Sequence, residues 1–139
     1  MIIKQISVFV ENKPGRLAEI TNIIAENNIN MRALSLADTS DFGILRIIVD
    51  DTDKVKNILK ENGIMVKITN VLSICVEDKP GGLAEILKIL ASENIGIEYM
   101  YAFVSKQISG SAYVIMRIEE DVKAMEILKK AGYTGLNIE

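Results

Sequence analysis

Two short stretches of this sequence have residue types and spacing that could hold a small charged ligand. Each has a polar residue, a lysine and a proline–glycine pair, followed by an apolar helical pattern: Asn12-Lys13-Pro14-Gly15-Arg16-Leu17 and Asp78-Lys79-Pro80-Gly81-Gly82-Leu83. Proline fixes φ and lacks an N–H group, which suits a helix entry, and glycine allows a sharp turn. The next amides form a helix N-terminus, whose free N–H groups and dipole attract carboxylates or phosphates. The alternative is a tight strand-to-helix turn that binds nothing.

The scarcity of some residue types argues against several kinds of active site. The chain has no His and only one Cys, Cys75, so the commonest general acid/base is missing and a zinc site is not expected. Helix-borne carboxylates such as Glu19 and Glu85 recur among Leu and Ile neighbours, where we expect them to be solvated. We therefore expect no catalytic residues, no metal and no cofactor.

Charge and hydropathy indicate which classes of partner and which cellular compartment to expect. The formal net charge is −3, which argues against nucleic acid as a partner because a phosphate backbone requires clustered Lys and Arg. No apolar run approaches the roughly 18 residues that a membrane-spanning helix needs. The start, Met1-Ile2-Ile3-Lys4, leads directly into a strand pattern without a signal-peptide layout. Together with the single cysteine, these features predict a cytoplasmic protein.

The stretch around the first turn is one part of an internal repeat. Pro14 recurs as Pro80, an offset of 80 − 14 = 66 residues, and the match continues to Ile29 and Ile95. Farther along the offset grows, as loops absorb insertions at little cost. The repeat predicts two copies of one small module, residues 1–69 and 70–139.

The elements that position the two turns follow from hydrophobic periodicity. Each copy has the order strand, helix, strand, strand, helix, strand, with alternation typical of strands and three- to four-residue spacing typical of helices. In the first copy, strands are expected around 6–10, 31–37, 43–49 and 65–69, and in the second around 72–76, 97–104, 111–118 and 133–138. This order predicts an α+β fold of two ferredoxin-like βαββαβ modules, each an antiparallel four-stranded sheet with both helices on one face.

The link between the copies is short. Residues 69–71 reach only about 10 Å, too little to cross several strands at ~4.8 Å each, as side-by-side pairing of the modules within one chain requires. Two solutions stay open: the fourth strands, 65–69 and 133–138, are exchanged between the modules, or the modules pair between two chains. With these solutions open, we expect some form of homodimer.

The two turns, together with this element order, resemble the ACT domain, whose signature is (N/D)-(R/K)-P-G-x-L. The resemblance covers nearly the whole chain twice. It implies a regulatory module that binds an amino acid at the interface of paired modules. It also implies that the module controls an enzyme either on the same chain or in trans.

Serine-binding members of that family indicate which positions contact the ligand. They use an Asn two residues before the proline and another at the start of the second strand, which correspond to Asn12 and Asn30; the second copy has Asp78 and Gly96 there. They also carry a His four residues before the proline, where this chain has Val10, so serine itself is in doubt. We predict that the first copy is the better site and that the ligand-binding residues are Asn12, Lys13, Pro14, Gly15, Arg16, Leu17, Asn30, Met31, Asp78, Lys79, Pro80, Gly81, Gly82 and Leu83.

Simpler interpretations exist for several of these residues. Asn30 suits local bonding at the start of a strand, and Lys13, Lys79 and Arg16 suit plain solvated charge. The resulting hypothesis is a non-catalytic amino-acid sensor that acts in trans on a metabolic enzyme or pathway. The alternatives are an enzyme on the same scaffold and a ligand-free structural adaptor or dimerisation module.

Overall fold

The computed structural model describes residues 1–38 and 41–136. Helices and strands follow the order expected for two βαββαβ copies as far as α4, except that the single strand β4 stands in place of two expected strands. The first copy supplies β1 (Ile2–Glu11), α1 (Arg16–Glu26), β2 (Met31–Asp38), β3 (Phe42–Val49) and α2 (Thr52–Glu61). The strand β4 (Val66–Glu77) leads into the second copy, which continues with α3 (Gly82–Ser92), β5 (Tyr99–Val104), β6 (Ser111–Arg117) and α4 (Asp121–Lys130).

The observed sheet differs from the expected pair of four-stranded sheets. The strands form one six-stranded sheet, in the order β2-β3-β1-β4-β6-β5, rather than two separate four-stranded sheets. The segments expected at 65–69 and 72–76 join into the single strand β4, because no Gly or Pro interrupts the chain between them. The expected last strand, 133–138, is not a regular strand over 133–136, and its remainder lies outside the described residues.

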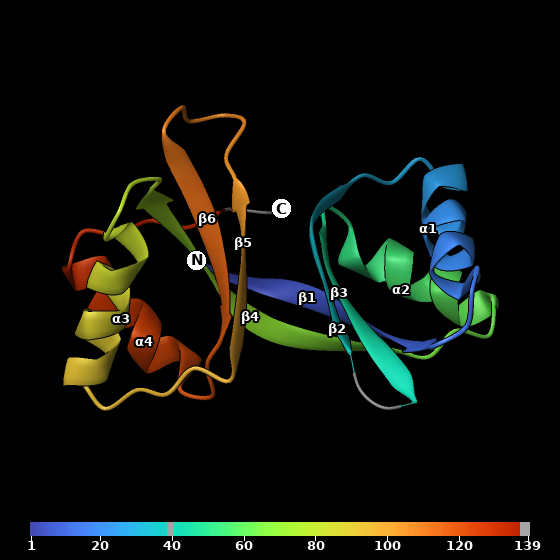
Figure 1. Cartoon of the computed structure of the whole chain (residues 1–139), viewed down its shortest axis with the longest axis horizontal. Coiled ribbons are helices and arrows are strands. Elements are labelled where there is room, and N and C mark those ends of the chain that lie inside the picture. The colour runs from blue at the N-terminus through green and yellow to red at the C-terminus, as the bar shows by residue number, and fades with distance from the viewer. Residues whose placement is uncertain (39–40, 137–139) are drawn as a thin grey trace. The chain divides into compact units, whose positions relative to one another are not determined.

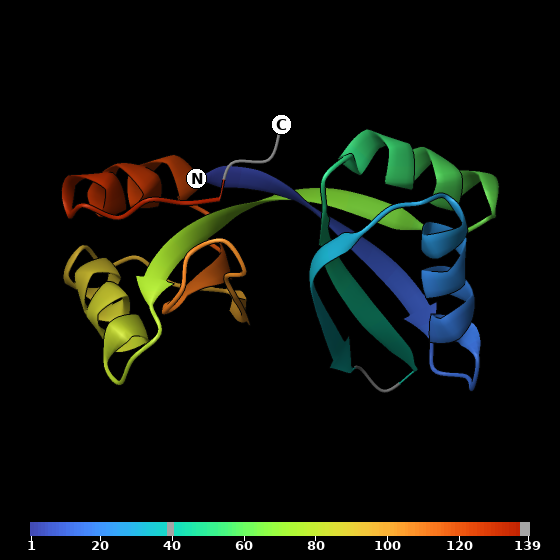
Figure 2. The same ribbon diagram turned by 90° about the horizontal axis from the view of Figure 1, so that it is seen from above.

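The chain divides into two compact units. The N-terminal unit is Lys4–Thr69, and the C-terminal unit contains Met1–Ile3 together with 70–136 of the described residues. Figure 1 shows α1 and α2 on one side of β2 and β3, and α3 and α4 on one side of β5 and β6, and Figure 2 gives a second view. Each unit therefore has the one-sided helical layer that the repeat predicted.

The core of each unit follows from the strand and helix periods. In the N-terminal unit, Ile6 pairs with Ile47 and Val8 with Leu45, and these four side chains are buried against the helices. Each helix contributes a pair of buried apolar side chains four positions apart, which lie on one helical face; the pairs are Ile20 with Ile24, Val55 with Leu59, Ile86 with Leu90, and Ala124 with Leu128. Burying a large aliphatic side chain contributes about 1.5–3 kcal/mol, so these pairs fix the helices and the turns before them.

The first residues of the chain belong to the C-terminal unit. The N–H of Ser73 on β4 donates to the carbonyl of Met1 at 2.8 Å, and the N–H of Cys75 donates to Thr134 at 2.7 Å. Gly135 lies so close that a Cβ there would collide with the Ser73 carbonyl oxygen. Segments from both ends of the chain are therefore held by the same part of β4.

Candidate functional site

The first predicted turn is a short segment between β1 and α1 that is held by backbone hydrogen bonds. The N–H of Lys13 donates to the carbonyl of Glu11 at 2.8 Å, and the N–H of Arg16 donates to that of Lys13 at 3.2 Å. Gly15, at the N-cap position of α1, has φ 85°, in the left-handed region that favours glycine. No side-chain hydrogen bond caps α1 at Gly15, and the start of a helix carries free N–H groups and the positive end of the helix dipole. This end of α1 suits a carboxylate.

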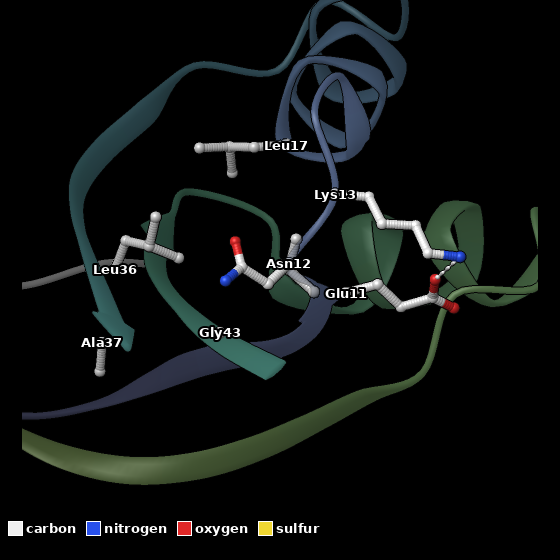
Figure 3. Close-up of a pocket in the computed structure, with 8 residues that line it drawn as sticks. Glu11, Asn12, Lys13, Leu17, Leu36, Ala37 and Gly43 are labelled. Carbon is white, nitrogen blue, oxygen red and sulfur yellow. Dashed lines mark ion pairs between the residues drawn. The ribbon is translucent and has the colours of Figure 1, made fainter. Parts of the chain in front are cut away.

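A cavity of about 400 Å³ opens beside this turn. Figure 3 shows the amide of Asn12 pointing into it, with the side chains of Leu17 and Leu36 nearby. Five segments supply its lining, which are the end of β1, the turn, α1 and the ends of β2 and β3; the residues are Val10, Glu11, Asn12, Lys13, Leu17, Leu36, Ala37 and Gly43. Its size lies within the usual range for small-molecule sites.

The charged groups beside the cavity pair with one another. The Nζ of Lys13 lies 3.1 Å from Oε2 of Glu11, and this hydrogen bond lowers the pKa of the Glu11 carboxyl below its usual value. Figure 3 shows this pair pointing away from the Asn12 amide. The Nη1 of Arg16 lies 2.9 Å from Oε2 of Glu19, one turn along α1. The Asn12 amide is therefore the polar group that enters the cavity.

The structure brings together only some of the predicted residues. Asn12, Lys13 and Leu17 line the cavity, whereas Pro14, Gly15 and Arg16 shape the turn without lining it. The lining also includes five residues that the prediction missed, and they are Val10, Glu11, Leu36, Ala37 and Gly43. The signal that finds them is strand register, since Gly43 pairs with Val10 and Ala37 pairs with Ile44.

Asn30 and Met31 lie at the far end of β2 from the cavity. Met31 pairs with Val49, whereas Ala37, six residues later, pairs with Ile44 beside the cavity. At about 3.3 Å per residue, the two ends of the strand are roughly 20 Å apart. Asn12 and Asn30 of one copy therefore do not contact the same small ligand.

The turn of the second copy is built more tightly. The N–H of Asp78 donates to the carbonyl of Gly110 at 2.9 Å, and Gly81 has φ 87°, like Gly15. A Cβ on Gly82 would collide with the carbonyl oxygen of Glu77. This position therefore has no room for the side chain that Arg16 supplies in the first copy.

Charged groups of the second turn form a small cluster with Tyr133. The Lys79 ammonium pairs with the Glu77 carboxylate, and this hydrogen bond raises the pKa of Lys79. Burial, followed by the charge of Glu85 and the hydrogen bond that the Tyr133 hydroxyl donates to it, raises the pKa of Tyr133. The remaining predicted residues of this copy are the turn residue Pro80 and the first-turn residue Leu83, which stays partly exposed.

The C-terminal unit has a second cavity, of about 320 Å³, at the start of α4. It is lined by Gly96, Ile97, Glu98, Ile118, Glu119 and Glu120. Gly96 is the counterpart of Asn30, and the Glu98 carboxylate lies 3.6 Å from Nε of Arg117. The second copy therefore has glutamates around the position at which the first copy has the amide of Asn30.

The described residues hold no group of three or more His, Cys, Asp or Glu side chains placed to bind a metal ion. Within the same part of the chain, no helix has the length and hydropathy needed to cross a membrane. The first cavity thus offers an amide, paired charges and a helix N-terminus. These groups favour non-covalent binding of a small zwitterion.

Comparison with known families identifies the kind of protein that this fold and turn define. A family model described as an ACT domain pair matches residues 1–135. The chain therefore belongs to the ACT domain pair family, a regulatory and non-catalytic type of domain. The resemblance inferred from the two turns is thereby confirmed.

Solved structures with this fold include one similar in sequence. Protein BT0572 from Bacteroides thetaiotaomicron is 44% identical, the match covers 98% of this chain and 92% of that chain, and the TM-score is 0.91. The ligand-free regulatory subunit of aspartate kinase from Thermus thermophilus is 16% identical, over 94% of this chain and 97% of that one, with a TM-score of 0.62. The corresponding subunit from Thermus flavus is 15% identical, over 94% and 95%, with a TM-score of 0.64. At such identities the two subunits share the fold alone. No curated protein sequence matches the chain.

Proposed function

We propose that this protein is a non-catalytic cytoplasmic sensor that binds a free amino acid and regulates a metabolic enzyme or pathway in trans. The observation that carries the proposal is the cavity at the uncapped start of α1, with the Asn12 amide inside it. The α1 amides suit the ligand carboxylate, and the Asn12 carbonyl oxygen suits its ammonium group. Membership of a regulatory family supports the same role.

A second copy of the chain would complete this site. Strands β2 and β5 are the edges of the sheet, and Leu34 on β2 is 56% exposed. Exposed apolar edge strands favour pairing with another chain. If two β2 strands pair antiparallel around Leu34, the partner's Asn30 comes near the Ala37 end of this strand, beside Asn12. We therefore propose a homodimer whose site uses the turn of one chain and Asn30 of the other.

Thermal unfolding of the full chain against each common amino acid tests the proposal. A ligand present at 100 times its Kd should stabilise the protein by about 2.7 kcal/mol, which raises Tm by several degrees. We expect a selective shift that Asn12→Ala abolishes and that Asn30→Ala weakens. Asp78→Ala, the matching change in the second copy, is the control and should leave the shift in place.

Two results would count against the proposal. If no amino acid shifts Tm or gives heat on titration, the ligand-free adaptor becomes the better description. If Asp78→Ala abolishes binding and Asn12→Ala does not, the site lies in the second copy and the assignment to the first is wrong.

A further inference from the structure

We infer that the first-copy cavity selects an amino acid with an apolar side chain, aliphatic or aromatic, and rejects charged ones. The inference rests on the proposed function, since it concerns the same cavity. Among the described residues, the apolar ones that line it are Val10, Leu17, Leu36 and Ala37, and the amide of Asn12 points into the same cavity. Because the amide and the α1 amides suit the ligand's own carboxylate and ammonium, the apolar groups are left for its side chain.

The charges near the cavity do not serve a charged ligand side chain. Lys13 and Glu11 neutralise each other at 3.1 Å, and Arg16 is bound to Glu19 at 2.9 Å. The charged residues in the described lining are Glu11 and Lys13, which pair with each other, so a charged ligand side chain would lose its hydration without gaining an unpaired partner in that lining, which is strongly unfavourable. Aspartate, glutamate, lysine and arginine should bind poorly for this reason.

Apolar surface at the cavity is left uncovered by the unit itself. Leu36 is 51% exposed although it projects from the helix-facing side of β2, opposite Leu45. A ligand that covers such surface gains affinity with each methylene group it buries, by about fourfold per group. Leucine and phenylalanine should therefore bind more tightly than alanine or serine.

The room for a large side chain depends on Gly43. A Cβ at this position would lie 3.2 Å from Cδ1 of Leu36, so the missing side chain leaves space that Leu36 borders. The second copy differs at the corresponding places, because Ala102 replaces Leu36 and Phe103, stacked on Tyr113 at 5.5 Å between ring centres, replaces Ala37. The selectivity is accordingly assigned to the first copy.

Isothermal titration of the full chain with leucine, phenylalanine, alanine, serine, aspartate and lysine tests this inference. Leucine or phenylalanine should bind at least about tenfold more tightly than serine, with aspartate and lysine weaker still. Gly43→Ala should weaken binding of the larger two by about tenfold and of alanine by less than about threefold, because the new methyl group pushes Leu36 into the cavity.

A second variant reports on the apolar wall itself. Leu36→Ser should reduce the preference for leucine over serine, whereas Met100→Ser, on the other edge strand at 42% exposure, should leave it unchanged. Tighter binding of serine, aspartate or lysine than of leucine and phenylalanine would overturn the inference but leave the sensor intact. An unchanged preference in both Gly43→Ala and Leu36→Ser would also overturn it. Binding of no amino acid at all would overturn the sensor and the inference together.

Discussion

Arg16 and Gly82 occupy the same position of the repeat, yet only the first has room for a side chain. The carbonyl of Glu77 fills the place of a Cβ at Gly82, whereas Arg16 extends along α1 to Glu19. The duplicated turn has therefore diverged in backbone packing as well as in sequence. The difference matters because the turn positions the first amides of each helix.

Replacing Gly82 should lower the free energy of unfolding more than replacing its counterpart Arg16 does. Gly82→Ala forces a methyl group against rigid backbone, so we expect a loss of about 1–3 kcal/mol in the free energy of unfolding. Arg16→Ala removes only a partly exposed ion pair and should change it by less than about 1 kcal/mol. Urea denaturation of both variants measures the difference. Equal losses in the two variants would show that the Glu77 carbonyl moves aside freely.

The same residues show how far sequence reasoning reached. Asn12, Lys13 and Leu17 could be predicted to lie close together because the turn that holds them is local and carries its own Pro and Gly. Leu36 and Gly43 were missed because they reach the cavity only through the register of β2, β3 and β1. Register depends on pairing between distant segments, and a single sequence does not specify it position by position.

Among the elements, β4 shows where the sequence misled. The alternating pattern predicted two short strands with a link at 69–71, but Asn70 and Val71 continue one strand, and Val71 is fully buried. Periodicity finds strands well, but it places their ends poorly when no Gly or Pro marks a stop. The one-sided helices were predictable, because each helix carries its own apolar stripe.

Tyr133, in the segment after α4, lies beside Glu85 of α3. Its hydroxyl donates to the Glu85 carboxylate, and burial together with that negative charge raises the pKa of Tyr133. A folded-state pKa above the unfolded value contributes stability at pH values below the unfolded pKa. That contribution is lost as the pH rises through the folded pKa, which places the window above about pH 10.

Ultraviolet titration of tyrosine ionisation tests this link. The difference between the wild type and Tyr133→Phe isolates Tyr133 and should show a pKa above the ordinary tyrosine value. Glu85→Gln removes the negative charge, so this pKa should fall toward the ordinary value. Glu19→Gln, the matching change in the first copy, where Ile64 replaces the tyrosine, should leave it unchanged. A Tyr133 pKa that does not respond to Glu85→Gln would refute the contact.

At the scale of the whole molecule, the proposed dimer depends on the edge strand β2. We expect Leu34→Lys to weaken the proposed dimer by more than about tenfold, because antiparallel pairing around Leu34 brings the two lysines together. Val122→Lys introduces the same charge at an apolar residue of α4 that is 53% exposed, and it should leave the dimer intact. Sedimentation equilibrium at micromolar concentration measures both. Identical association of the two variants would place the interface elsewhere.

The position of Met1–Ile3 in the C-terminal unit has a consequence for the order in which the chain matures. During synthesis these residues are made before Ser73, which bonds to Met1 and follows 73 − 1 = 72 residues later. Thr134, which bonds to Cys75 on the same strand, follows later still. The residues of the unit Lys4–Thr69 are therefore all synthesised early, whereas the other unit cannot be completed until Thr134 has been made. Contacts of such long sequence separation are slow to form. During part of translation, the unit Lys4–Thr69 would thus be folded while Ile2 and Ile3 are not yet packed in the C-terminal unit.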